Sequence, residues 1–206
     1  MRGLSFIMSM SSRSSETLLP GNMALLLLLV MLTACAALPQ DMSGKMFTFP
    51  QESKTAYVRL TTPRQSLSAV TLCLRTFTDL DRGHAPFSLA TPGVANAFVI
   101  FGSAKDNEVT MSVRNKEVRF RELGYKTNTW HSFCSTWDSG SGVGQIWLDG
   151  KPSSRKYINS GSNITGLINI VLGQDQDEHG GRFNAKQSFV GMMSDVHMWD
   201  YTLSPC

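Results

Sequence analysis

The sequence has little charge of either sign, and this scarcity excludes some classes of protein. Charged residues make up 17% of the 206 residues, and the formal net charge is only +3. So mild a basic balance does not support binding to nucleic acid. With 42% apolar residues and 17 glycines, the composition is that of an ordinary globular domain. The length suffices for one domain with a proper core.

The sequence also lacks the short motifs of common enzymes. It contains no G-x-S-x-G nucleophile motif, no phosphate-binding loop and no C-x-x-C pair. Its four histidines, His84, His131, His179 and His197, show no metal-ligand spacing, so we expect them to face solvent or to be satisfied by hydrogen bonds. No convincing amphipathic helix is present. These absences argue against an enzyme.

A purely apolar run occurs near the N-terminus, where Met23–Leu32 is followed by small residues in "TACAALPQ". The run is too short to span a bilayer comfortably, which takes roughly 20 residues. It is typical of a signal peptide, which we place at residues 1–37, with Met23 as an alternative start. The mature chain, residues 38–206, would then be secreted. The stretch "LTAC", which ends at Cys35, is an alternative signal of the bacterial lipoprotein type.

Three cysteines lie beyond the predicted signal peptide, and in an oxidising compartment two of them should pair. Cys73 and Cys134 both lie in strand-like segments, so we predict a disulfide between them, with Cys206 left over. Asn163-Ile164-Thr165 is a glycosylation sequon, which is used only if the chain is secreted and the loop exposed.

Hydrophobic residues recur with a period of two over most of the chain, and Gly, Asn, Asp and Pro clusters separate the segments. Ile146-Trp147-Leu148 followed by Asp149-Gly150 is a strong hairpin signal. We therefore predict an all-β protein, a two-sheet antiparallel sandwich of the jelly-roll type. The strand-like segments are 56–61, 70–74, 98–101, 109–114, 117–121 and 168–172.

One of these strands is basic. Arg119 and Arg121 lie on one face beside Glu117, which dilutes their charge. A solvated strand face is therefore the favoured interpretation, and an anion-binding patch is the alternative.

Side-chain oxygens gather on a glycine-rich loop that runs from Gly173 to Gln187. Calcium takes six to eight oxygen ligands from carboxylates, amides and carbonyls. Asp175, Asp177 and a carbonyl at Gln176 can bend around one ion. Asn184 and Gln187 would return from the far side of the Gly180-Gly181 turn. The loop does not fit an EF-hand, because Lys186 stands where a bidentate glutamate belongs.

Two other interpretations of this loop stay open. Paired carboxylates could serve glycoside hydrolysis, as in sandwich enzymes with an E-x-D-x-x-E strand. Here Asp175-x-Asp177-x-x-Gly180 lacks the third acid. The third interpretation is a solvated acidic loop without a site.

Several stretches together resemble the pentraxin family, in its short branch. They cover residues 46–205, and the family is secreted and builds a concanavalin-like jelly roll that binds calcium on one face. The stretches are "MFTFP" with "TAYVRL", "SFCSTWDS", "WLDGKP", "VLGQDQD" and "VHMWDYTLSP". In the signature, Ser132 replaces the family's histidine, and His131 lies one place early.

The resemblance implies a calcium site and a ligand pocket. Its metal ligands would be Asp175, Gln176, Asp177, Gln187 and Asn96, with Asn184 at the place of a bridging glutamate and Ala95 at the place of an aspartate. We therefore expect one Ca²⁺ rather than two.

The pocket that the resemblance implies would hold phosphocholine. Phe101 would contact choline methyls, Glu117 would face the ammonium, and Ser112 would leave space. Without the resemblance, Phe101 is a core residue, and Glu117 is a partner of Arg119 or Arg121. Cys73 and Cys134 also fall at the positions of the family's intrachain disulfide.

The resemblance predicts a calcium-dependent pattern-recognition protein, without enzymatic activity, that binds phosphocholine-bearing or polysaccharide ligands on microbes or damaged cells. Family members form rings, usually pentamers. The family pattern continues into a helix and closing strands, which this sequence lacks, so we expect an incomplete domain with impaired ring assembly. Two alternatives are a carbohydrate-active enzyme on a related sandwich and a truncated form without ligand binding.

Overall fold

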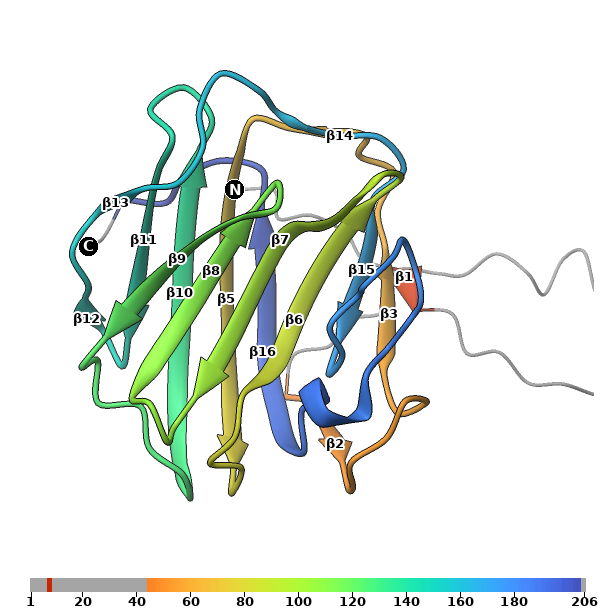
Figure 1. Cartoon of the computed structure of the whole chain (residues 1–206), viewed down its shortest axis with the longest axis vertical. Coiled ribbons are helices and arrows are strands. Elements are labelled where there is room, and N and C mark those ends of the chain that lie inside the picture. Colours follow the sequence, from red (N-terminus) through yellow and green to blue (C-terminus); the bar gives the residue numbers. More distant parts are fainter. Residues whose placement is uncertain (1–6, 9–43, 205–206) are drawn as a thin grey trace, which may run out of the picture.

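The computed structural model of the chain describes residues 7–8 and 44–204. Almost every element in it is a β-strand, and the strands form two large antiparallel sheets that face each other (Figure 1). The only helical element among the described residues is η1 (Ala185–Gln187), a single 3-10 turn. The predicted all-β jelly-roll sandwich is confirmed.

We call the first seven-stranded sheet the front sheet, because it lies nearer the viewer in Figure 1. Its strands β6, β7, β8 and β9 follow one another in the chain and pair as successive antiparallel neighbours, with β9 at the edge of the sheet. In spatial order the strands are β1 (Ile7–Met8), β3 (Val58–Thr61), β15 (Asn169–Leu172), β6 (His84–Thr91), β7 (Val94–Ser103), β8 (Glu108–Val113) and β9 (Lys116–Arg121).

The other large sheet, the rear sheet, is centred on two ten-residue strands that pair along their whole length, β5 and β10. In spatial order its strands are β12 (Lys151–Pro152), β11 (Val143–Leu148), β10 (Thr129–Asp138), β5 (Ala69–Thr78), β16 (Gly191–Trp199) and β2 (Met46–Phe49), and β13 (Lys156–Tyr157) also pairs with β11. A small third sheet joins β4 (Ser66–Leu67) to β14 (Ile164–Thr165).

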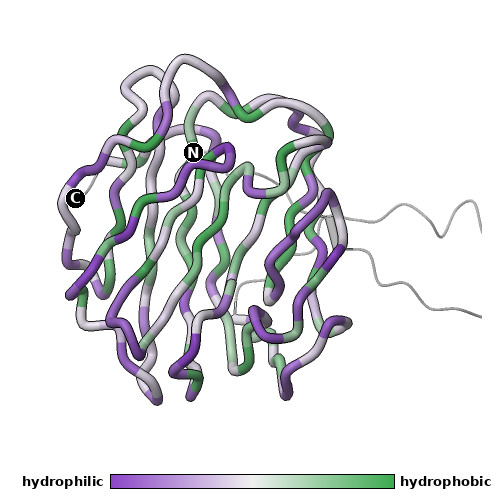
Figure 2. Tube along the Cα trace, viewed as in Figure 1, coloured by the Kyte–Doolittle hydropathy of each residue, from purple (hydrophilic) through white to green (hydrophobic). Residues whose placement is uncertain are grey.

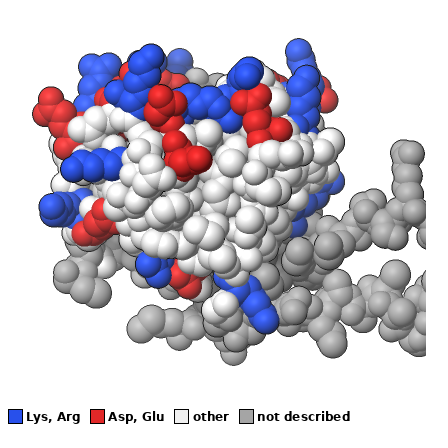
Figure 3. Space-filling view, turned by 90° about the horizontal axis from the view of Figure 1, so that it is seen from below, with Lys and Arg blue, Asp and Glu red and all other residues white. Residues whose placement is uncertain are grey.

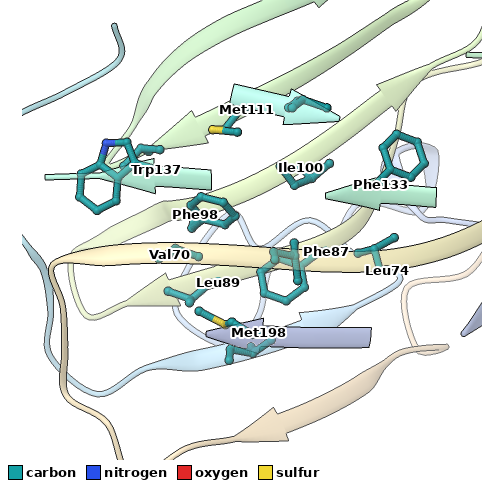
Figure 4. Packing of buried hydrophobic residues seen from close by; sticks show 14 of the residues in the cluster. Val70, Leu74, Phe87, Leu89, Phe98, Ile100, Met111, Phe133, Trp137 and Met198 are labelled. Carbon is teal, nitrogen blue, oxygen red and sulfur yellow. The ribbon is translucent and has the colours of Figure 1, made fainter. Parts of the chain in front are cut away.

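The core fills the space between the two large sheets. Alternate residues of each strand point inward, as the period of two requires. On β7, Phe98 and Ile100 are buried in the core. The rear sheet contributes Leu74 and Trp137 to the same core (Figure 4). The apolar stretches accordingly lie within the strands of the sandwich, and hydrophilic residues are frequent in the connections (Figure 2).

The hairpin predicted at Asp149-Gly150 joins β11 to β12. Asp149 has a φ of 52° and Gly150 a φ of 76°, so both central residues adopt the left-handed conformation of a two-residue hairpin turn. The carboxylate of Asp149 has a second role, because it accepts hydrogen bonds from the backbone N–H of Ser132 and from Nδ1 of His131, both at 2.8 Å.

Cys73 and Cys134 form the predicted disulfide. They face each other directly across the β5–β10 pair, with their Cα atoms 4.1 Å apart. Both are partly exposed, whereas Leu72, Leu74 and Phe133 beside them are buried. The disulfide therefore lies on the outer face of the rear sheet, away from the core.

Several expectations fall on residues that the structure does not describe. These are the signal peptide over residues 1–37 apart from Ile7–Met8, the alternative start at Met23, and the fates of Cys35 and Cys206. Within the described part of the chain, no helix is long and apolar enough to cross a membrane. On the face shown in Figure 3, basic and acidic side chains are interspersed, as the small net charge suggests.

Candidate functional site

The loop from Gly173 to Gln187 lies against the outer face of the front sheet. It leaves β15 through Gly173, which has a φ of +86° and whose added Cβ would collide with the ring of Phe49. Gly173 is therefore the residue type that this turn requires. All eight residues of the neighbouring strand β6 are buried, because the core covers one face and the loop covers the other.

Two glutamines anchor the loop. Gln176 is fully buried, and its Oε1 accepts hydrogen bonds from Nδ2 of Asn169 at 2.6 Å and from the backbone N–H of Gly180 at 2.9 Å. Its Nε2 donates to the carbonyl of Ser88 at 3.1 Å. Gln174 donates to the carbonyls of Ser53 and Ala56. The side chain of Gln176 is therefore committed to the interior, and only its backbone carbonyl is left as a candidate metal ligand.

The aspartates that alternate with these glutamines point the other way. Asp175 and Asp177 line a groove of about 380 Å³ beside the loop. Most of the sequence-predicted site residues meet here, although they come from widely separated segments. The groove is lined by Gly83, Asn96, Val99, Phe101, Ser103, Asp106, Glu108, Thr110, Ser112, Glu117, Arg119, Asp175, Asp177 and Gln187.

One end of the groove presents the oxygen atoms expected of a metal site. Nε2 of Gln187 donates to Oδ2 of Asp175 at 3.3 Å, whereas Oδ1 of Asp175 is buried without a hydrogen-bond partner. Burial, and then the nearby charge of Asp177, raise the pKa of Asp175 to about 6. Asn96 of β7 also lines the groove. The two carboxylates of Asp175 and Asp177 thus lie close enough for their charges to repel each other.

Arg82 holds the backbone around Gln187 in place, and the sequence analysis did not identify this residue. Its Nη1 donates to the carbonyls of Gly83, Lys186 and Ser188 at 3.0, 2.8 and 3.0 Å. Lys186 and Ser188 flank Gln187, so Arg82 fixes the backbone on both sides of that candidate ligand. Glu52 holds the arginine in turn, with 3.4 Å between Nη2 of Arg82 and Oε2 of Glu52.

The strand register sets the floor of the groove. Val99 of β7 pairs with Ser112 of β8, which pairs with Glu117 of β9. In the next row, Phe101 pairs with Thr110, which pairs with Arg119. In a third row, Ser103 pairs with Glu108, which pairs with Arg121. The side chains of these rows share the outer face of the front sheet, because residues two apart on a strand point the same way.

Phe101 is placed by a glycine. An added Cβ on Gly83 would lie 2.5 Å from Cε1 of Phe101, so the ring rests directly on the backbone at Gly83. Phe101 is partly exposed and belongs to the groove, whereas its neighbours Ile100 and Gly102 are buried. It is therefore not a core residue.

Glu117 belongs to a chain of charges at the other end of the groove. Nε of Arg119 lies 3.0 Å from Oε1 of Glu117 and 3.8 Å from Oε1 of Glu108. Nε of Arg121 donates to Oε2 of Glu108 at 2.8 Å. Hydrogen bonding and the charge of Glu108 raise the pKa of Arg121, which stays charged. Asp106 is a third acid at this end, where its Oδ2 accepts a hydrogen bond from Ser103 Oγ at 2.6 Å.

Asn184 is not brought into the groove, in contrast to the expectation that it supplies a metal ligand. It is exposed and forms the N-cap of η1, where its Oδ1 accepts a hydrogen bond from the backbone N–H of Lys186 at 3.1 Å. Amide side chains are preferred at such caps, and this accounts for the residue without a metal. Asn163, the glycosylation candidate, is exposed, and its Oδ1 accepts a hydrogen bond from Ser139 Oγ at 3.0 Å.

The acidic side chains that line the groove are all carboxylates. No histidine, lysine or cysteine is among its lining residues in the described part of the chain. The buried His84 bonds to the carbonyl of Arg82 and to Tyr125 Oη, and the buried His131 bonds to Asp149. In residues 7–8 and 44–204, no three His, Cys, Asp or Glu side chains form a metal cluster. A metal at the Asp175 end would therefore depend on amide and carbonyl oxygens as well as two carboxylates.

Comparison with known proteins identifies the family. The sequence profile described as "Pentaxin family" matches residues 45–206. Human C-reactive protein is 42% identical over 168 residues, which are 80% of this chain and 74% of that protein. Rat mucosal pentraxin is 43% identical over 165 residues, which are 79% of this chain and 74% of that protein.

The solved structures agree on the fold. A native heptameric SAP-like pentraxin from Limulus polyphemus superposes with a TM-score of 0.69 at 23% identity, covering 78% of this chain and 77% of that one. The order of strands, the matched profile and the relatives at about 40% identity lead to one conclusion. The chain belongs to the pentaxin family, whose members are also called pentraxins.

Proposed function

We propose that this protein is a secreted recognition protein that binds phosphocholine-type phosphate esters through Ca²⁺. The observation that carries the proposal is the meeting of Asn96, Phe101, Glu117, Asp175 and Gln187 in one groove. These residues come from two strands, β7 and β9, and a distant loop. Their convergence supports a shared ligand better than it supports a solvated acidic loop.

The Asp175 end fits calcium. A buried carboxylate oxygen without a partner, beside a second carboxylate, is an arrangement that a divalent cation stabilises. Asp175, Asp177, Asn96, Gln187 and the carbonyl of Gln176 would hold the ion. Once bound, it would supply positive charge for phosphate oxygens. Because Asn184 caps η1 outside the groove, we propose one ion rather than two.

The rest of the groove suits the organic part of the ligand. Phe101 and Val99 offer apolar surface, and Ser112 in the same face is small enough to leave space above the sheet. Glu117 contributes negative charge near the far wall. A phosphate at the calcium end and an alkyl substituent over Phe101 would each meet a complementary surface.

Secretion and recognition of microbial or damaged-cell surfaces are part of the same proposal. The intrachain disulfide supports an oxidising compartment. The sequence similarity to C-reactive proteins and mucosal pentraxins supports a binding role rather than a catalytic one.

Retention on immobilised phosphocholine tests the proposal. The secreted chain should be retained in millimolar Ca²⁺ and should elute with a chelator or with free phosphocholine. Asp177→Ala should not be retained, whereas Glu178→Gln, which changes the next acid in the loop, should behave like the wild type. Calcium-independent retention, or no retention of folded protein at any calcium concentration, would contradict the proposal.

A further inference from the structure

The charge of the groove at its Glu117 end depends on Arg119, which the sequence alone assigned to a solvated strand face or to an anion-binding patch. Arg119 lies in the same cross-strand row as Phe101, two strands away across Thr110. Neighbouring strands are about 4.8 Å apart, so the backbones at Phe101 and Arg119 are separated by roughly 10 Å. A small ligand that rests on Phe101 therefore approaches the guanidinium of Arg119 directly.

Arg119 also forms an ion pair with Glu117, the carboxylate that a cationic group of the ligand would contact. Its Nε lies 3.0 Å from Oε1 of Glu117, which is within hydrogen-bond distance. An ammonium group that reached Glu117 would have to displace this guanidinium or share the carboxylate with it. In either case it would come close to a like charge, and this lowers the gain from electrostatic complementarity.

The arrangement of charges keeps Arg119 in place. Glu108 lies on the other side of the arginine, 3.8 Å from Nε, and its side chain is only 12% exposed. A carboxylate as buried as Glu108 favours nearby cations, and it has both Arg119 and Arg121 beside it. Arg119 thus lies between two acids on the sheet, whereas Arg121 contacts Glu108 and does not line the groove.

We infer that Arg119 is a specificity-determining residue, which makes the groove accept phosphate monoesters with little preference for a quaternary ammonium group. This inference rests on the proposed function. Binding would be governed by the calcium-held phosphate and by the apolar surface of Phe101, and the ammonium of phosphocholine would contribute little. The ligand class is therefore phosphate monoesters in general, including uncharged glycerol-type substituents.

The test compares two small probes, phosphocholine and glycerol 3-phosphate, by calorimetric titration of the calcium-loaded protein. Arg119→Gln should strengthen phosphocholine binding by roughly two- to fivefold, the range expected for one exposed charge pair, and should leave glycerol 3-phosphate binding nearly unchanged. Arg119→Lys keeps the charge and should behave like the wild type. Arg121→Gln is the matched control, because it removes an equally exposed arginine of the same strand that does not contact Glu117.

The outcomes separate the two proposals. If the wild type binds both probes and Arg119→Gln leaves their affinity ratio unchanged, or Arg121→Gln changes it equally, the role of Arg119 is overturned and the proposed function stands. If no variant binds either probe in calcium, the proposed function is overturned and this inference with it. A phosphocholine preference that rises only in Arg119→Gln supports the inference.

Discussion

Gln187 donates a hydrogen bond to one oxygen of Asp175, and the other oxygen of the same carboxylate is buried without a partner. The amide thus stabilises the carboxylate only in part, and the nearby charge of Asp177 works against it. This relationship suggests that the calcium-free site is a source of instability in the folded protein.

Asp175→Asn should therefore stabilise the calcium-free protein. The folded-state pKa of Asp175 is raised from 3.8 to about 6, so the ionised group costs up to about 3 kcal/mol at neutral pH. The cost is absent below pH 3.8 and grows as the pH rises through 6. Denaturant unfolding in a chelator should show the gain at pH 7.5 and not at pH 4. Glu178→Gln is the control, and equal stability of the wild type and Asp175→Asn at pH 7.5 would contradict the prediction.

Asn96 and Asn184 should differ in their effect on calcium affinity. Asn96→Ala removes an oxygen from the groove and should weaken calcium binding several-fold. Asn184→Ala removes only the cap of η1, which is worth about 0.5–2 kcal/mol of local stability, and should leave calcium affinity within about twofold. Calorimetric titration of both variants measures this, and a large loss of affinity in Asn184→Ala would show that this residue is a ligand after all.

Arg82→Met should weaken calcium binding without touching a ligand. The variant keeps an unbranched stem but loses the guanidinium and its hydrogen bonds to the carbonyls of Lys186 and Ser188, so Gln187 is held less firmly. We expect roughly a tenfold loss, in line with other residues that orient metal ligands. Glu52→Gln, which leaves those hydrogen bonds in place, should have a smaller effect. Unchanged calcium affinity in a folded Arg82→Met protein would show that Arg82 does not orient Gln187 for metal binding.

His84 should make the fold sensitive to mild acid. Burial lowers its pKa from 6.5 to about 4, and its two ring nitrogens contact the carbonyl of Arg82 and Tyr125 Oη. A depressed pKa gives stability that is present above pH 6.5 and is lost as the pH falls toward 4. The loss should approach about 3 kcal/mol. His84→Gln should lose less between pH 7 and pH 4.5 in denaturant titrations, and a pH dependence equal to that of the wild type would assign the acid sensitivity elsewhere.

Phosphocholine binding should depend on Phe101 and Glu117. Phe101→Ala removes the apolar wall that rests on Gly83, and Glu117→Lys places a cation beside Arg119 at the same end of the groove. Charge reversal should also weaken binding, because it places a second cation beside Arg119 where the ammonium of phosphocholine would lie. Competition assays on immobilised phosphocholine measure both variants, and wild-type binding by both would place the ligand elsewhere.

Local sequence patterns predicted the strands well. The alternation around Val109 and Met111 became β8, and Asp149-Gly150 became the turn between β11 and β12. Such patterns succeed because period and turn conformation depend on neighbouring residues. The pairing of Cys73 with Cys134 was also predictable, since both lie in strands and the other candidate was at the chain end.

The details of the site were less predictable, because they depend on long-range register. Gln176 and Gln187 have the same side chain, yet one is buried against Ser88 and the other lines the groove. Arg119 enters the groove only because β9 pairs with β8 in a register that aligns it with Phe101. Gly83 supports that ring from a segment with no distinguishing pattern. None of these relationships is encoded within a short window of sequence.

The groove and the disulfide belong to different sheets of the sandwich. Every lining residue of the groove belongs to the front sheet, its connections or the covering loop, whereas the disulfide crosses β5 and β10 of the rear sheet. The disulfide and the groove thus lie in separate layers of the sandwich, with the core between them. We therefore expect substitutions on the outer rear face to leave the shape of the groove unchanged, so that the two outer faces can evolve separately.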